Sequence, residues 1–417
     1  MKYRTYSAIV ADTMLRTVHS LVKQSAERLG LSPTTVQELL EPNVVHEFTI
    51  TLKSGKQFKA FRSQHSNARG PYKGGIRFHP GVNKQEVVAL SILMSLKTAL
   101  VGIPLGGGKG GIAVDPNQLS TDELEELSRL YVRQLSDHIG PQKDIPAPDV
   151  QTNAQIIDWM VDEYALITGD TSRASFTGKS LSNGGSQGRE EATGRGGYVV
   201  MKTILDAAGV ADADYALQGI GNVGTFFAQC AAASIPTWRC LAAADSKSAI
   251  EHNEIVIADL IEYKKSHRTL LHFPKSKQIT EKQLLHTNCT ILVLAALGGV
   301  VTKDIAPNIR AKYILELANG PVADDAFAAL ATQGTIVVPD ILANAGGVVA
   351  SYYEWVQNIR GEHWSEPEVR KKLDATMVSA TQAVQRWAEL EGCSLKEAAI
   401  DVAIKNLLLS NASYSNL

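Results

Sequence analysis

The sequence has few cysteines, no long apolar run and almost no net charge, and each of these shortages excludes a class of protein. Four cysteines in 417 residues, with no CxxC pair, give no basis for a disulfide framework or a zinc site. No uninterrupted apolar stretch reaches the roughly 18 residues of a membrane span, and the first segment is too polar for a signal peptide. A formal net charge of -2 favours neither nucleic acid nor an anionic membrane as a partner. We therefore expect a soluble, cytoplasmic protein.

The chain is longer than one hydrophobic core usually serves, so two domains are expected. Residues 86–100 are apolar nearly all round, which predicts a buried helix. Residues 178–197 are rich in glycine and polar groups without a clear period, and they indicate the start of a second domain. Strand and helix signals then alternate from 215 to about 339, which favours a parallel α/β sheet. The last part is helical, and Ser365 and Glu368 have the spacing of a capping box.

A glycine-rich turn of the form GxGxxG follows a strand-like segment and precedes an amphipathic one. In such a turn the first glycine allows a tight bend, the second lets the backbone approach a pyrophosphate, and the third lets a helix pack closely. Asp245 ends the next strand-like run, near the spacing at which an acidic group binds a ribose hydroxyl, although a turn or capping role also fits. Ser246 and Lys247 follow and suit a 2′-phosphate, so NAD and NADP both stay open, with NAD favoured. The turn consists of Gly219, Ile220, Gly221, Asn222, Val223 and Gly224.

Three lysines occupy positions that are unusual for a solvated amine. Lys73 and Lys109 each lie in a glycine cluster, and Lys97 lies near the end of the apolar helix, although each alone would pass for a surface residue. A lysine in a buried helix costs several kcal/mol unless an anion pairs with it, so two such lysines suit a substrate with two carboxylates. A partly desolvated Lys109 could act as a base. Asp149, presented between prolines, could move a proton, and a loop or capping role fits it equally well.

Several long motifs in the right order resemble the glutamate dehydrogenase family, within the wider group of glutamate, leucine, phenylalanine and valine dehydrogenases. The resemblance covers nearly the whole chain and implies an α/β fold of two domains. It implies an N-terminal α/β substrate-binding and oligomerisation domain over 1–183, completed by C-terminal helices at 345–417, and a Rossmann-like dinucleotide-binding domain over 184–344. Members are commonly homohexamers, and their interdomain cleft closes on the substrate. The matching segments are residues 64–80, 96–116, 144–153, 177–196, 219–224, 318–321 and 339–358.

The same resemblance implies NAD(P)-dependent, reversible oxidative deamination of L-glutamate to 2-oxoglutarate and ammonia, with roles for individual residues. It implies Lys109 as the catalytic lysine, Asp149 as the catalytic aspartate and Lys97 as the ligand of the substrate α-carboxylate. Lys73 and Ser351 correspond to the pair that binds the side-chain carboxylate. The remaining matches line the substrate side-chain pocket (Gly74, Ala147 and Val348) or contact the nicotinamide end (Thr193 and Asn344), and Arg189 lies in the same matched segment as Thr193.

Two alternatives remain open from the sequence. Branched-chain and aromatic amino acid dehydrogenases resemble this chain but lack a lysine at the position of Lys73, because a lysine facing an apolar substrate would be left unpaired. The second alternative is a non-catalytic relative that kept the fold. It is motivated by Gly298 and Gly299, which stand where the family often has polar residues near the cofactor. The joint presence of Lys73, Lys109 and the other catalytic matches argues against it.

Overall fold

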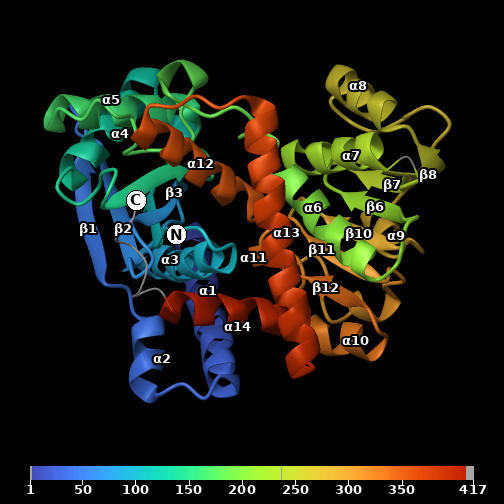
Figure 1. The fold of residues 1–417 in the computed structure, drawn as a ribbon. Helices are drawn as coiled ribbons and strands as arrows, with labels where there is room; N and C mark the ends of the chain where they lie inside the picture. The colour runs from blue at the N-terminus through green and yellow to red at the C-terminus, as the bar shows by residue number, and fades with distance from the viewer. Residues whose placement is uncertain (1, 236, 410–417) are drawn as a thin grey trace. The chain divides into compact units, whose positions relative to one another are not determined.

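The computed structural model describes residues 2–235 and 237–409 (Figure 1). By internal packing the chain divides into two compact units. Unit 1 comprises Met1–Arg189, Val348–Val369 and Ile400–Leu417, and unit 2 comprises Glu190–Gly347 and Arg370–Ala399. The sequence expectation grouped all of 345–417 with the first domain, whereas residues 370–399 pack with unit 2. Residues 410–417 of that range lie outside the described residues.

Unit 1 is built on a mixed five-stranded sheet of order β1-β2-β4-β3-β5. The strands β1 and β2 form an antiparallel hairpin, and β3 runs parallel to both β4 and β5. The strands are β1 (Val44–Thr51), β2 (Gln57–Ser66), β3 (Tyr72–Phe78), β4 (Gly107–Ile112) and β5 (Asp144–Pro148). The helices are α1 (Lys2–Arg28), α2 (Pro33–Leu40), α3 (Lys84–Leu100), α4 (Thr121–Leu135) and α5 (Ala154–Thr168), with short 3-10 turns at Pro116–Gln118 and Leu181–Asn183.

The two faces of this sheet are covered by different helices. Ala60 of β2 belongs to a core that α4 and α5 share with the sheet, whereas its neighbour Phe61 packs with Val82 and with Val87 of α3. Successive strand residues point to opposite faces, so α3 covers one face and the α4–α5 pair the other. The helix expected over residues 86–100 is confirmed, and it starts at Lys84 because Asn83 caps it by accepting the Glu86 N–H at 3.1 Å.

Unit 2 contains a seven-stranded sheet of order β12-β11-β10-β6-β7-β8-β9. The five strands from β12 to β7 are parallel, which confirms the Rossmann-like α/β expectation. The strands are β6 (Asp214–Gln218), β7 (Arg239–Ala244), β8 (Ala249–Ile255), β9 (Lys277–Ile279), β10 (Ile291–Leu294), β11 (Tyr313–Glu316) and β12 (Ile336–Val338). The helices are α6 (Ala192–Ala207), α7 (Asn222–Ser234), α8 (Ile257–His267), α9 (Glu281–Leu285), α10 (Phe327–Thr332) and α11 (Asp340–Ala343), with 3-10 turns at Ala306–Asn308 and Asp324–Ala326.

The strand order of unit 2 places a ligand site at one edge of its sheet. From β6 the chain moves to β7 on one side and later returns to β10 on the other, so the order reverses between β6 and β10. Doubly wound sheets bind ligands beside the carboxyl ends of the strands at such a reversal. The glycine-rich turn after β6 lies at this place.

Three C-terminal helices have residues in both units: α12 (Gly346–Arg360), α13 (Glu366–Glu391) and α14 (Leu395–Leu408). The capping pair expected before α13 is present, since Glu368 accepts hydrogen bonds from the Ser365 N–H and hydroxyl at 2.7 Å. Among the residues that the structure describes, no helix is long and apolar enough to cross a membrane.

Candidate active site

The register of the unit 1 sheet brings Lys109 and Asp149 together. Ile76 of β3 pairs with Gly110 on one side and with Pro148 on the other, so the residues next to these partners lie close in space. Lys109 Nζ is 2.9 Å from Asp149 Oδ2, and the two side chains are 9% and 21% exposed. An amine and a carboxylate in direct contact and largely shielded from water can exchange a proton without an intervening group.

Arg77 completes this site and was missed by sequence reasoning. Its Nε lies 3.0 Å from Asp149 Oδ2, and its Nη1 contacts Glu86 of α3. Burial alone would raise the pKa of Asp149, but Lys109 and Arg77 lower it to about 2, so this carboxylate stays ionised. A signal was available, because Arg77 is a charged residue inside a mostly buried strand that directly follows the Lys73 glycine cluster.

Two glycines of β3 are required by close packing. A Cβ on Gly74 would lie 1.6 Å from the Gly108 carbonyl oxygen, and a Cβ on Gly75 would lie 2.7 Å from the Asp149 Cβ. Any side chain at these positions would push β3 away from β4 or displace the Asp149 carboxylate. The pocket-lining role of Gly74 stays a prediction, as does that of Ala147, which pairs with Gly75 in β5 and is 7% exposed.

Lys73 is a buried cation without a counter-ion. Its residue is 1% exposed, and no carboxylate of the described residues lies within ion-pair distance of its amine. Burial lowers the pKa of Lys73 to about 7, the positive charges of Arg62 and Arg189 act in the same direction, and the charges of Glu354 and Asp144, which are beyond ion-pair distance, only partly oppose them. Lysine is seldom buried unless it is paired, so this position calls for an anionic ligand.

Arg189 and Ser351 are joined by a hydrogen bond of 3.2 Å from Nε to Oγ. Ser351 is 2% exposed on α12, and Val348 lies three residues earlier on the same helix face. Arg189 also acts electrostatically on Lys73, so two cations and a hydroxyl gather in this part of unit 1. Lys97 lies in the last turn of α3 and is half-buried. All eight residues predicted for substrate and catalysis therefore belong to unit 1.

The GxGxxG turn in unit 2 has the geometry that its glycines predict. Gly219 has φ of +98°, and a Cβ on Gly224 would lie 2.0 Å from the Gly219 carbonyl oxygen. A Cβ on Gly221 would meet nothing within 4 Å, so space is open above this residue. The helix α7 begins at Asn222, directly after it, and its N–H groups face the carboxyl edge of the sheet. A dinucleotide pyrophosphate fits this turn.

Asp245 is held by its own surroundings. Its Oδ1 accepts the Lys247 and Ser248 N–H groups at 2.8 Å, and its Oδ2 accepts the Leu270 N–H at 2.9 Å and contacts Lys264 Nζ. The side chain is 3% exposed. This geometry matches the turn role that the sequence left open, and it leaves little of the carboxylate available to a ribose hydroxyl.

The backbone conformation and the packing of unit 2 explain why glycine stands at positions 298 and 299. Gly299 has φ of +68°, and a Cβ on Gly298 would lie 2.9 Å from the Asn319 carbonyl oxygen. A side chain at position 298 would press against the loop that contains Asn319, and one at position 299 would be in a strained backbone conformation. Asn344 donates from Nδ2 to the Leu317 carbonyl oxygen at 3.3 Å and to Asn319 Oδ1 at 3.1 Å. Thr193 lies in the first turn of α6, also in unit 2.

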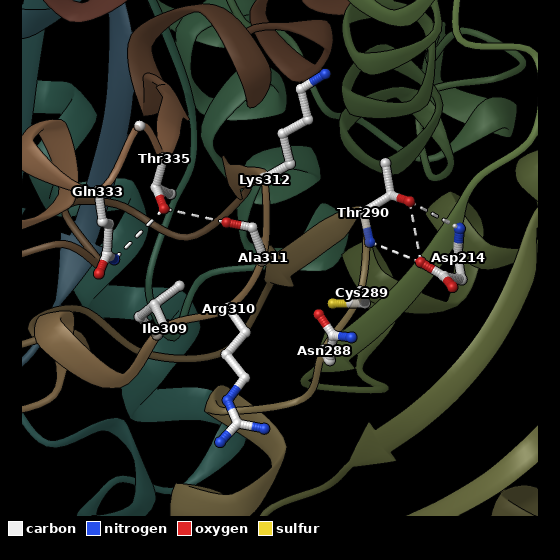
Figure 2. Close-up of a pocket in the computed structure, with 11 residues that line it drawn as sticks. Asp214, Asn288, Cys289, Thr290, Ile309, Arg310, Ala311, Lys312, Gln333 and Thr335 are labelled. Carbon is white, nitrogen blue, oxygen red and sulfur yellow. Dashed lines mark hydrogen bonds between the residues drawn. The ribbon is translucent and has the colours of Figure 1, made fainter.

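A cavity of about 570 Å³ in unit 2 is lined by none of the residues predicted for the substrate, the catalytic step or the cofactor (Figure 2). Its lining includes the amino ends of β6, β10, β11 and β12, the opposite sheet edge from the GxGxxG turn. Two of its polar side chains are bonded within the lining: Asp214 Oδ1 accepts the Thr290 N–H at 2.6 Å, and Thr335 Oγ1 donates to the Ala311 carbonyl oxygen at 3.1 Å. The carboxyl edge therefore remains the candidate cofactor site.

Comparisons with known proteins show the family of this chain. Residues 184–413 match the family model described as Glutamate/Leucine/Phenylalanine/Valine dehydrogenase, and residues 42–166 match the Glu/Leu/Phe/Val dehydrogenase dimerisation domain. The NAD-specific glutamate dehydrogenase of Clostridioides difficile is 42% identical over 400 residues, which are 93% of this chain and 94% of that protein.

Two solved structures are similar over nearly the whole chain. Glutamate dehydrogenase from Peptoniphilus asaccharolyticus has a TM-score of 0.86 and 41% identity, with coverage of 95% of this chain and 98% of that chain. The hetero-hexameric glutamate dehydrogenase from Thermus thermophilus, in its Leu-bound form, has a TM-score of 0.86 and 33% identity, with coverage of 95% of both chains.

Proposed function

Since the chain belongs to the Glu/Leu/Phe/Val dehydrogenase family, we propose that it catalyses the reversible oxidation of L-glutamate with water and NAD or NADP, giving 2-oxoglutarate, ammonia and the reduced dinucleotide. The observation that favours glutamate over an apolar amino acid is the buried, unpaired Lys73. A second substrate carboxylate supplies the missing counter-ion. We also propose a homohexamer: the hetero-hexameric relative from Thermus thermophilus supports six subunits, and the assembly from one kind of chain is what the sequence resemblance implies.

Substrate recognition is assigned to the cations of unit 1. Lys97 binds the α-carboxylate and orients the Cα–H bond. Lys73, with Ser351 and Arg189, binds the far carboxylate, since these groups gather where burial leaves positive charge uncompensated. A carboxylate that enters this environment gains more from each cation than it would in water.

The chemical steps are assigned to Lys109 and Asp149. The residues of the GxGxxG turn would hold the dinucleotide, which would supply the acceptor for the hydride of the substrate Cα. The amino acid imine that remains is attacked by water, from which Lys109 in its neutral form removes a proton. Asp149, in contact with Lys109 at 2.9 Å, passes protons between that amine and the departing ammonia. Arg77 keeps Asp149 ionised and oriented between transfers.

The assay for this proposal follows absorbance at 340 nm with glutamate, leucine or no amino acid, and with each dinucleotide in turn. We expect reduction that depends on glutamate. Faster reduction with leucine would favour a branched-chain amino acid dehydrogenase. Absence of reduction under all conditions would favour a non-catalytic relative.

The titration of Lys73 predicts a pH dependence specific to glutamate. The protonated amine binds the far carboxylate, and its pKa in the unliganded protein is lowered to about 7. As pH rises above this value, the charged fraction falls by about tenfold per pH unit, and kcat/KM for glutamate should fall relative to that for norvaline. Norvaline has the same chain length without the carboxylate, so the ratio cancels titration of the catalytic groups. A ratio that stays constant from pH 6 to 9 would contradict the assignment of Lys73.

The surroundings of Asp245 predict a preference for NAD that depends on Lys264. Asp245 carries a negative charge near the expected ribose, and Lys264 partly neutralises it. The substitution Lys264→Ala should therefore strengthen repulsion of a 2′-phosphate and lower kcat/KM for NADP by about tenfold relative to NAD. Both dinucleotides are measured with the wild type and the variant. A wild type about tenfold more efficient with NADP would show instead that Lys247 or Lys264 binds the phosphate.

A further inference from the structure

Glu316 is a buried carboxylate of unit 2 that the proposed mechanism does not use. It ends β11 and is 1% exposed. Its Oε1 accepts the Val322 N–H at 3.1 Å, and its Oε2 accepts the Asp340 N–H at 3.1 Å. One carboxylate thus joins the loop of residues 317–322 to the first residue of α11. Each of these N–H groups points at a different side-chain oxygen, so both oxygens must accept a hydrogen bond. A carboxylate has two accepting oxygens, whereas the amide of glutamine has one.

Two further side chains hold the same loop. Asp340 Oδ2 accepts the Gly320 N–H at 2.9 Å, and Asn344 at the end of α11 donates to Asn319 Oδ1 at 3.1 Å. Burial raises the pKa of Glu316 to about 8, and the charge of Asp340 acts in the same direction. Lys396 of α14 and the two backbone hydrogen bonds lower it. Lys396 also lies 3.7 Å from Asp324, so it is shared between two carboxylates.

The loop of residues 317–322 lies at the sheet edge expected to bind the dinucleotide. Its Leu317 N–H donates to the Leu294 carbonyl oxygen of β10 at 2.9 Å, and its Gly320 carbonyl oxygen accepts the Gly299 N–H at 2.9 Å. The loop after β10 in turn packs against the GxGxxG turn, since a Cβ on Gly219 would lie 2.8 Å from the Ala296 Cβ. Displacement of the 317–322 loop would therefore change the space beside the glycine turn and the position of Asn344.

We propose that Glu316 is a positioning residue for the dinucleotide: through its two backbone hydrogen bonds it sets the 317–322 loop and Asn344 in the shape that the nicotinamide half requires. The inference rests on the proposed function. Glu316 acts through the loop, so its loss affects dinucleotide binding and leaves glutamate recognition, which is assigned to unit 1, unchanged.

The test is the variant Glu316→Gln, which turns an NH2 group toward a backbone N–H and so loses one of the two bonds. We expect the Kd for the reduced dinucleotide, measured by its fluorescence, and the KM for the oxidised form to rise by at least about tenfold. The KM for glutamate should change by less than about twofold. Glu163→Gln is the matched control, since Glu163 is a buried carboxylate of unit 1 that accepts a hydrogen bond from Arg133 Nε at 2.5 Å. It should leave the dinucleotide Kd unchanged.

An unchanged dinucleotide Kd in folded Glu316→Gln, or equal losses in both variants, would overturn the inference. If Glu316→Gln does not fold, the second variant is Asp340→Asn, which weakens the hydrogen bond from the Gly320 N–H in the same loop. Its dinucleotide Kd and its KM for glutamate are then compared in the same way. A wild type that neither binds the reduced dinucleotide nor oxidises glutamate would instead refute the proposed function. The two failures are therefore distinguishable.

Discussion

The variants Lys109→Ala and Asp149→Asn are each expected to lose at least about a thousandfold in kcat for glutamate, while the Kd of the reduced dinucleotide changes by less than about threefold. Alanine removes the amine that contacts Asp149, and asparagine cannot take up and release a proton. The Kd of the reduced dinucleotide is expected to change little because the GxGxxG residues belong to unit 2, whereas Lys109 and Asp149 belong to unit 1.

Steady-state turnover and fluorescence titration give the two constants. The exposed Lys84 at the start of α3 provides a control, and Lys84→Ala should retain turnover within about twofold because its amine is solvated. The double variant should be little worse than either single variant, since the two groups act as one unit. If Lys109→Ala kept more than about a tenth of wild-type turnover, a barrier change of only about 1.4 kcal/mol, Lys109 would not be the base.

The substitution Lys73→Leu is expected to lower kcat/KM for glutamate by at least about a hundredfold and to leave that for norvaline within about fivefold. The leucine removes the positive charge that binds the far carboxylate of glutamate. It places an apolar side chain next to the position of the norvaline methyl group. Thermal stability should be kept or increased, because Lys73 is buried without a carboxylate partner among the described residues. A loss of glutamate activity would then not arise from unfolding.

Lys179 is the matched control for Lys73. Its side chain is also buried, but its Nζ lies 2.7 Å from Glu354 Oε1, so Lys179→Leu leaves a buried carboxylate unpaired. That variant should lose about 3–5 kcal/mol of stability and lower activity on norvaline as well as on glutamate, since the Glu354 charge that it leaves unpaired also acts on Lys73. Lys73→Leu should keep both stability and norvaline activity. Equal losses on glutamate and norvaline in Lys73→Leu would show that Lys73, like Lys179, has a structural role, and the proposed substrate would lose its main support.

The sequence was most informative where neighbouring residues define the structure. The capping pair of Ser365 and Glu368 and the GxGxxG turn each depend on contacts within a short stretch of chain, so their residue types predict their geometry. The long motifs also predicted an α/β fold of two domains, and the two separate sheets confirm it. They predicted the family as well, which the comparisons confirm.

The partners of the charged groups could be decided only by the tertiary structure. Arg77 meets Asp149 across 72 positions, Arg189 meets Ser351 across 162, and Asp245 is occupied by Lys264 and Leu270 from another element. A sequence shows that an ionisable group is present, but its protonation and its availability depend on which charges and N–H groups surround it once the chain is packed. For this reason Lys73 could be recognised as unusual from its glycine neighbours, whereas its lack of a counter-ion became visible only when β3 was packed against β4 and β5.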